Sequence, residues 1–207
     1  MPFRRFFNWI KRIFHGRKSI SLGLYGPPNA GKTTLANKIS FDWTGEEMGK
    51  VSEVPHETRA VQKKEHVVVK TGNNQIEMNL LDMPGISTKV DYKEFIEYGL
   101  SKEEAQQRAK EATSGVIEAI KWLEHVNTAL VVMDAGKDPY TQVNITIIGN
   151  LEAREIPIII VANKIDLPDA LPDKIREAFP QHHVVEISAK TGKGIDVLYE
   201  TIAKYAS

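Results

Sequence analysis

The sequence predicts an α/β domain of three layers, in which helices cover both faces of a mostly parallel sheet. Short apolar runs alternate with helical patterns along the 207 residues, as in domains built from strand–helix–strand units. One run leads into a glycine-rich turn, and two others read as a hairpin. We therefore expect a six-stranded sheet with one antiparallel edge strand.

Apolar runs at residues 19–25, 65–70, 75–81, 128–133, 156–162 and 184–187 predict the strands. The second and third runs are joined by the turn Thr71-Gly72-Asn73-Asn74. Helices are expected from Lys32 to about Phe41 and over 195–205. The polar stretch 42–64 contains glycine and proline and predicts a long loop.

Residues 86–127 contain two helix-start signals. Asp91 with Glu94 and Ser101 with Glu104 are candidate capping boxes, and Gly99 stands where the first helix would stop. Alanine and other apolar residues then recur at helical spacing. We predict a short helix followed by a long one, in a segment that either forms an effector surface or only packs on its own domain.

The chain has a basic amino terminus on an acidic body. Residues 1–18 carry six bases and no acid, which leaves 21 bases against 27 acids in the remainder. On a helical projection the apolar residues fall on one face, with Trp9 at its border, and the bases fall on the other. The apolar face comprises Phe3, Phe6, Phe7, Ile10, Ile13 and Phe14.

We expect this basic amphipathic helix, residues 1–18, to stand apart from a domain over residues 19–207. It fits an anionic membrane surface best, with a partner protein, its own domain and RNA phosphates as alternatives. The chain has no cysteine, which excludes a disulfide scaffold and a thiolate site. No apolar run has the length that a spanning helix needs.

The turn at residues 26–33 reads Gly-Pro-Pro-Asn-Ala-Gly-Lys-Thr and matches GxxxxGK[ST] between a strand and a helix. Backbone N–H groups of such a turn wrap a phosphate, and the helix start adds positive potential. Lys32 would reach the β- and γ-phosphates, and the Thr33 hydroxyl would bind Mg²⁺. Nucleotide contacts are expected from Gly26, Pro27, Pro28, Asn29, Ala30, Gly31, Lys32, Thr33 and Thr34.

Asp82-Met83-Pro84-Gly85 comes at the end of the next long apolar strand. There the Asp82 carboxylate can hold Mg²⁺, and the Gly85 amide can meet a γ-phosphate.

Asn163-Lys164-Ile165-Asp166 ends a later strand and suits a guanine base. The Asp166 carboxylate can accept hydrogen bonds from the N1 and N2 edge of guanine, a donor pair that adenine lacks. Asn163 and Lys164 would brace the loops, with the lysine stem over the base. The base site is completed by residues after the last strand, Ser188, Ala189 and Lys190, of which the Ala189 amide can donate to guanine O6.

The ordered motifs GPPNAGKT, DMPG, NKID and SAK resemble the signature of translation-factor-class P-loop GTPases. Asn29 and the Pro84-Gly85 pair resemble the Era-like branch. The resemblance covers roughly residues 19–206 and implies a G domain that binds GTP or GDP with Mg²⁺ and hydrolyses GTP. It also makes Asn29 a candidate K⁺ ligand, as the matching asparagine is in several members.

The resemblance extends to the switch threonine. Glu57-Thr58-Arg59 is similar to the segment that supplies it in this branch, so Thr58 is expected to bind Mg²⁺, with Ser52 and Thr44 as alternatives. The residues expected to act in catalysis are Lys32, Thr58 and Gly85.

Three features depart from the family pattern. Ile86 stands where Ras-like proteins have a water-positioning glutamine, and no arginine finger can be named, so hydrolysis should be slow. The segment after Gly85 is longer than a Ras-like switch needs. The sequence ends after the last G-domain helix, so an rRNA role like that of Era is not expected.

The sequence therefore predicts a small regulatory GTPase that changes loops 42–64 and 86–100 between states. We expect it to be cytoplasmic and peripheral on the inner face of the membrane. Further expected partners are an unidentified effector, an activating protein and a second copy in a nucleotide-dependent dimer. The alternatives are a ribosome- or RNA-associated assembly GTPase, whose basic arm contacts RNA, and a nucleotide-gated interaction protein with negligible catalysis.

Overall fold

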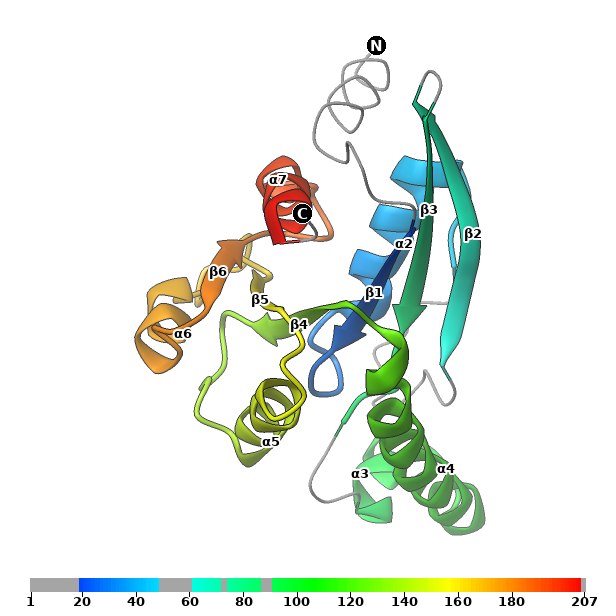
Figure 1. The fold of residues 1–207 in the computed structure, drawn as a ribbon. Coiled ribbons are helices and arrows are strands. Elements are labelled where there is room, and N and C mark those ends of the chain that lie inside the picture. Colours follow the sequence, from blue (N-terminus) through cyan, green and yellow to red (C-terminus); the bar gives the residue numbers. More distant parts are fainter. Residues whose placement is uncertain (1–18, 49–60, 72–73, 87–90, 206–207) are drawn as a thin grey trace.

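The computed structural model describes residues 19–48, 61–71, 74–86 and 91–205 (Figure 1). The amphipathic helix predicted over 1–18, the centre of the hairpin turn and the candidate switch threonine Thr58 lie outside these residues. In the described part, no helix combines the length and the apolar character needed to cross a membrane.

The described chain forms a six-stranded sheet flanked by helices (Figure 1). The strands are β1 Ser19–Tyr25, β2 Gln62–Thr71, β3 Asn74–Asp82, β4 Thr128–Asp134, β5 Ile158–Asn163 and β6 His183–Glu186. The helices are α2 Lys32–Thr44, α3 Tyr92–Glu97, α4 Lys102–Lys121, the 3₁₀ turn η1 Trp122–His125, α5 Gln142–Glu152, α6 Pro172–Ala178 and α7 Ile195–Tyr205.

The strand order is β2-β3-β1-β4-β5-β6. Among these strands, the pairing of the edge strand β2 with β3 is antiparallel. All other pairings are parallel. The predicted three-layer class, with one antiparallel edge strand, is therefore confirmed. Because the parallel strands run the same way, the loops that follow β1, β3, β4 and β5 meet at one edge of the sheet.

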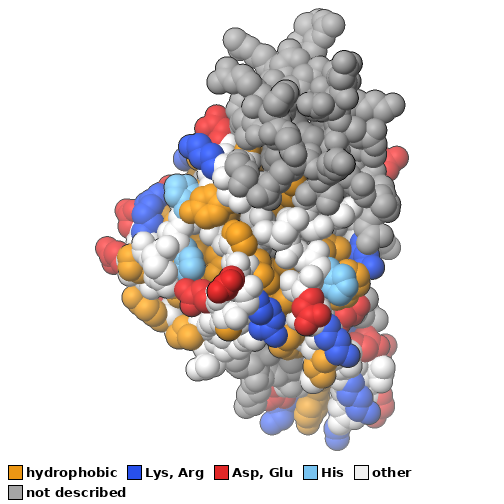
Figure 2. Space-filling model, viewed as in Figure 1, with side chains coloured by type: hydrophobic (Ala, Val, Ile, Leu, Met, Phe, Trp, Pro, Cys, Tyr) orange, Lys and Arg blue, Asp and Glu red, His pale blue; other side chains and the backbone are white. Residues whose placement is uncertain are grey.

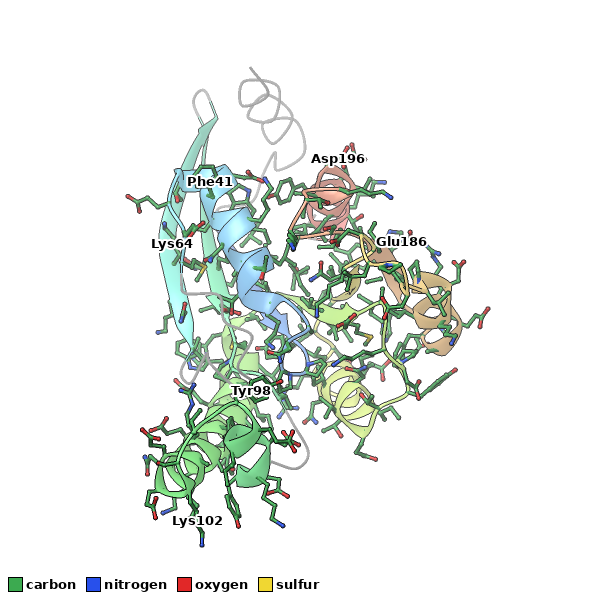
Figure 3. The ribbon with its side chains drawn as sticks, turned by 180° about the vertical axis from the view of Figure 1, so that it is seen from behind. Phe41, Lys64, Tyr98, Lys102, Glu186 and Asp196 are labelled. Carbon is green, nitrogen blue, oxygen red and sulfur yellow. The ribbon has the colours of Figure 1, made fainter. Side chains whose placement is uncertain are left out.

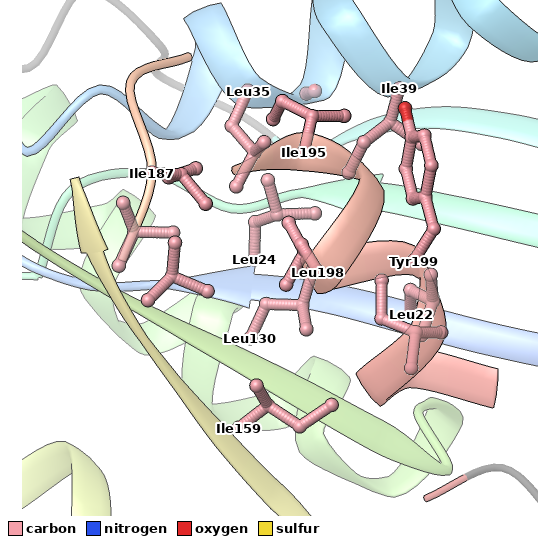
Figure 4. Packing of buried hydrophobic residues seen from close by; sticks show 14 of the residues in the cluster. Leu22, Leu24, Leu35, Ile39, Leu130, Ile159, Ile187, Ile195, Leu198 and Tyr199 are labelled. Carbon is pink, nitrogen blue, oxygen red and sulfur yellow. The ribbon is translucent and has the colours of Figure 1, made fainter. Parts of the chain in front are cut away.

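Alternation along the central strands divides the core between two faces. In β4, Leu130 and Val132 pack in one buried cluster, whereas Val131 and Met133 pack in the other. This is the two-residue period of a strand buried on both sides. Figure 4 shows the first cluster, where Leu35 of α2 and Leu198 of α7 cover the sheet. The second cluster lies under η1, α5 and α6.

Helix α2 is longer than predicted and shortens the loop expected over 42–64. It runs past Phe41 to Thr44, because Trp43 is 7% exposed and packs into the core beside the Tyr199 ring. Gly45 then adopts a left-handed φ of 81° and donates its N–H to the Phe41 carbonyl at 2.8 Å, which ends the helix. At the other end of that stretch, β2 already begins at Gln62.

The segment after Gly85 contains the predicted short and long helices, α3 and α4. The Ser101–Glu104 capping box is confirmed in both directions. The Asp91–Glu94 box is wrong, because the Asp91 carboxylate accepts from the Lys93 amide at 3.0 Å instead. Phe95 of α3 is fully buried against α4. The α3–α4 pair, with Tyr98 and Lys102, extends from the end of the molecule opposite Phe41 (Figure 3).

Candidate functional site

The glycines of the phosphate loop, residues 26–33, are required by the space around them. Gly31 has a φ of 93°, and a Cβ there would lie 2.3 Å from the Asn163 side-chain amide. Gly26 has a φ of 148°, and a Cβ there would lie 2.2 Å from the Val132 carbonyl oxygen. Gly31 is also the N-cap of α2 and supplies no capping side chain, so the first turn of α2 keeps N–H groups for an anion.

Gly31→Ala is expected to destabilise the protein by about 1–3 kcal/mol more than Gly45→Ala. Both glycines have a left-handed φ, but no atom of the described residues lies within 4 Å of a Cβ at Gly45. Gly45→Ala therefore reports backbone strain alone, about 1 kcal/mol, whereas Gly31→Ala adds the collision with Asn163. Urea unfolding of the two variants measures the difference, and equal losses would show that Asn163 yields without cost.

Lys32, Thr33 and Asp82 come together where β1 and β3 end. Lys32 is 6% exposed, and its ammonium donates to the carbonyl oxygens of Gly26 at 3.2 Å and Pro27 at 2.9 Å. The Thr33 hydroxyl donates to Asp82 Oδ2 at 2.7 Å. Among the described residues, Asp82 Oδ1 is buried without a hydrogen-bond partner. A buried carboxylate oxygen beside a threonine hydroxyl is a donor set that fits Mg²⁺.

Burial shifts the pKa values of Lys32 and Asp82 in opposite directions. It lowers the pKa of Lys32 to about 8, although the Asp82 carboxylate acts to raise it. Burial also raises the pKa of Asp82, against the influence of Lys32 and the Thr33 hydrogen bond. Burial therefore disfavours both charged forms, and a phosphate beside Lys32 or a cation beside Asp82 would stabilise them.

The Asp82-Met83-Pro84-Gly85 segment lies directly on the phosphate loop. A Cβ at Gly85 would lie 3.0 Å from Pro28 Cα, so only glycine allows this approach without displacement. The Ile86 amide donates to the Gly26 carbonyl at 3.2 Å. The Ile86 side chain is 6% exposed and packs in the core with Met83. At the position where Ras-like proteins have a water-positioning glutamine, this chain therefore has a core residue.

Asn163 joins the phosphate loop to the loops expected to hold the base. Its side-chain N–H donates to the Ala30 carbonyl at 2.9 Å, and its Oδ1 accepts from the Ala189 amide at 2.9 Å. The Ala189 amide, expected to donate to guanine O6, is thus engaged with Asn163 in this structure. Asn163 is 2% exposed, so it acts as a brace between three loops.

Asp166 lies exposed at the rim of the same edge. A hydrogen bond from the Ser188 hydroxyl is the main cause that lowers the pKa of Asp166, and the nearby charges of Lys190 and Lys164 lower it further. Ser188 itself is fully buried and also accepts from the Thr191 amide at 3.1 Å. The carboxylate is therefore ionised at neutral pH, as an acceptor for a base edge must be.

Asp134 also lies at this edge of the sheet, although the sequence did not predict it as a site residue. Asp134, the last residue of β4, is paired with Lys164, with 2.7 Å between Oδ2 and Nζ. The available signal in the sequence was a carboxylate at the carboxyl end of a buried strand, next to the strand that ends in Asn163.

The arrangement of these residues defines a class of protein. A phosphate loop after β1, an aspartate at the end of β3 and an Asn-Lys-x-Asp run after β5, on a sheet of this order, are the parts of a P-loop GTPase G domain. A family model described as 50S ribosome-binding GTPase matches residues 21–164, and the chain belongs to that family.

Relatives and solved structures agree with this assignment. The tRNA modification GTPase MnmE of Legionella pneumophila is 30% identical over 186 residues, which make up 90% of this chain and 34% of that protein. Translation initiation factor IF-2 of Wolinella succinogenes is 39% identical over 88 residues, 37% of this chain and 9% of the factor. The chain therefore spans about a third or less of these two relatives.

A solved structure of Era in complex with MgGDPNP and nucleotides 1506–1542 of 16S ribosomal RNA superposes with a TM-score of 0.69. The two sequences are 26% identical, and the match covers 91% of this chain and 57% of that one. The resemblance to the Era-like branch is thus confirmed for the G domain.

Proposed function

We propose that this chain binds GTP and GDP with guanine selectivity and hydrolyses GTP slowly, as a switch. The observation that carries the proposal is the 2.9 Å hydrogen bond from Asn163 to the Ala30 carbonyl. This bond joins the phosphate loop, residues 26–33, to the Asn-Lys-x-Asp run expected to bind guanine, at the same edge of the sheet. Competition binding with GTP, ATP and XTP tests the proposal, and equal affinities for GTP and ATP would contradict it.

Each described residue has a defined task in this proposal. The Lys32 ammonium neutralises charge on the β- and γ-phosphates, and the Gly85 amide meets the γ-phosphate. Thr33 and Asp82 would hold Mg²⁺, with Thr58 as the proposed third oxygen donor. When bound, Mg²⁺ supplies Lewis-acid stabilisation of the phosphate charge. The buried Ile86 side chain cannot orient an attacking water, which supports slow turnover.

Hydrolysis is expected to be faster in KCl than in NaCl of the same ionic strength. Asn29 lies exposed in the phosphate loop with a left-handed φ of 59°, and its amide oxygen is a suitable ligand for an alkali cation beside the phosphates. A cation there would supply positive charge beside the phosphates. Phosphate release in the two salts measures the effect, and Asn29→Ala should abolish it. Equal rates in both salts would contradict a K⁺ role.

The membrane attachment that we propose rests on residues 1–18. Its support is the apolar face, worth at most about 1–2 kcal/mol per fully buried side chain, and six bases at about 1 kcal/mol each near an anionic surface. On the face of the molecule that Figure 2 shows, charges of both signs are interspersed with apolar side chains. We therefore assign the proposed attachment to an anionic surface to the basic residues 1–18.

The full chain is expected to sediment with vesicles that contain anionic lipid, and less so as the salt concentration rises. Phe6→Asp with Ile10→Asp should abolish sedimentation, because it places charge on the apolar face. The matched control is Tyr140→Asp with Ile145→Asp, which adds the same charge at residues 61% and 49% exposed. The control should sediment like the unchanged chain, and equal behaviour of the two variants would contradict insertion.

A ribosome- or RNA-associated role is the second candidate. It is favoured by the family description and by the Era neighbour solved with a 16S rRNA fragment. In this case the bases of residues 1–18 would contact phosphates rather than lipid. Sedimentation of the full chain with 16S or 23S rRNA, beside the vesicle assay, separates the two roles. A Phe6→Asp, Ile10→Asp variant that still binds rRNA would favour the second.

A further inference from the structure

Asp134 lies at the site edge without a role in the proposed nucleotide contacts. It is the last residue of β4 and lies in register with Asn163, the last residue of β5. It is 9% exposed. The Ala135 amide donates to the Asn163 carbonyl at 2.9 Å, so the loops that follow β4 and β5 leave the sheet tied to each other. The Asp134 carboxylate, at the end of β4, therefore lies next to the Asn-Lys-x-Asp run that follows the neighbouring strand β5.

Both oxygens of Asp134 are used. Oδ1 accepts from the Gly136 amide at 3.0 Å, and Oδ2 accepts from the Lys164 ammonium at 2.7 Å. The first contact fixes the carboxylate to its own loop, and the second fixes the lysine to the carboxylate. A short charge-assisted bond to a nearly buried acceptor restrains a lysine far more than a solvated surface pair would.

Lys164 needs this restraint for the task proposed for it. Its stem has four rotatable bonds and loses considerable freedom when it is held in one arrangement. Its backbone has a left-handed φ of 68°, which sets the direction in which the stem leaves the loop. With that start set by the backbone and the ammonium held by Asp134, both ends of the stem are fixed.

We propose that Asp134 is a positioning residue for guanine binding, which holds the Lys164 stem as a preformed wall for the base. The inference rests on the proposed function, because it assumes that guanine lies against Lys164. Asp134 acts through Lys164 and does not itself touch the nucleotide. Restraining the wall before the base arrives lowers the entropy lost on binding.

Asp134→Asn breaks this arrangement with little change of shape. If the amide oxygen accepts from Gly136, the NH₂ group faces the ammonium, and donor meets donor. If the amide turns, the same conflict arises at the Gly136 N–H. The variant is expected to release GDP about tenfold faster, the loss of roughly one charge-assisted hydrogen bond. Binding of inorganic pyrophosphate, which has no base, should be unchanged.

The test is a double-mutant cycle on GDP dissociation in the full chain, with Asp134→Asn, Lys164→Met and both together. Lys164→Met keeps an apolar stem without the charge, so Asp134→Asn should add little on that background. Asp169→Asn is the control, because Asp169 is an exposed carboxylate beside Gly136 and should leave GDP release unchanged. Urea unfolding of each variant shows whether it folds.

Additive effects, or equal loss of GDP and pyrophosphate binding, would overturn the proposal and reduce Asp134 to a structural residue. Unchanged GDP release in Asp134→Asn would overturn it as well. If Asp134→Asn does not fold, the test is Lys164→Met alone, which must release GDP faster than the unchanged chain. Unchanged GDP release in Lys164→Met would contradict the proposed role of the Asp134–Lys164 pair. A wild-type chain that binds pyrophosphate but no GDP would instead contradict the proposed function, and the inference with it.

Discussion

Asp166→Asn is expected to change the base preference of this protein from guanine to xanthine. The Asp166 carboxylate offers two acceptors to the N1–H and N2 amine of guanine, and the Ser188 hydroxyl helps to keep it ionised. Asparagine presents one donor and one acceptor. It conflicts with the guanine amine but matches xanthine, which carries a carbonyl at the same ring position. Loss of a matched polar pair should weaken GDP binding on the order of a hundredfold.

Competition of GDP, XDP and ADP against a fluorescent nucleotide measures this preference. XDP should gain affinity in the variant while GDP loses it, and ADP should stay weak in both proteins. Asp173→Asn is the control, because Asp173 is an exposed carboxylate in the first turn of α6. A variant that binds GDP as tightly as the unchanged chain would show that the base lies elsewhere.

The central strands β4 and β5 were predictable because they are buried on both faces. Residues such as Leu130 and Val131 are fully buried on opposite sides of β4, so the sequence reads as a continuous apolar run. The end of α2 was not predictable in this way. Trp43 extends the helix because it finds a place beside Tyr199, a partner more than 150 residues away in the chain. Local helix propensity does not predict a contact between residues so far apart in the chain.

The site likewise contains parts that the sequence predicts and parts that depend on contacts between distant residues. Residues 26–33 were predictable as a phosphate loop, because the motif places its glycines and lysine in one short turn. The Asn163 contacts with Ala30 and Ala189 and the Asp134–Lys164 pair join separate loops. These contacts depend on strand order, which a motif does not encode. The buried position of Ile86 likewise follows from packing with Met83 rather than from its own type.

Lys32→Met is expected to slow GTP hydrolysis on the order of a hundredfold to a thousandfold, the usual loss when one preorganised charge donor is removed from a transition state. Methionine keeps most of the stem, so the core around position 32 stays filled. Single-turnover phosphate release at saturating GTP measures the loss. Lys38→Met is the control, because Lys38 pairs with Asp42 on α2. A Lys32→Met chain that hydrolyses GTP normally would remove this residue from the mechanism.

The same lysine predicts how the nucleotide-free protein responds to pH. Burial lowers the pKa of Lys32 from 10.5 to about 8, so between these values the unfolded chain binds more protons than the folded one. The free energy of unfolding without nucleotide should therefore gain a contribution that grows as the pH rises through this range. Phosphates require the charged ammonium, so nucleotide binding takes up a proton there, and affinity should fall above pH 8.

GDP titrations between pH 7 and pH 9 measure this dependence, with affinity nearly level at first and then falling by up to about tenfold per pH unit. Lys32→Met should bind GDP more weakly throughout and lose the part of the slope that begins near the pKa of about 8. Ionisation of guanine N1–H at higher pH affects both proteins alike, so the difference between them isolates Lys32. Parallel pH profiles for the two proteins would show that another group takes up the proton.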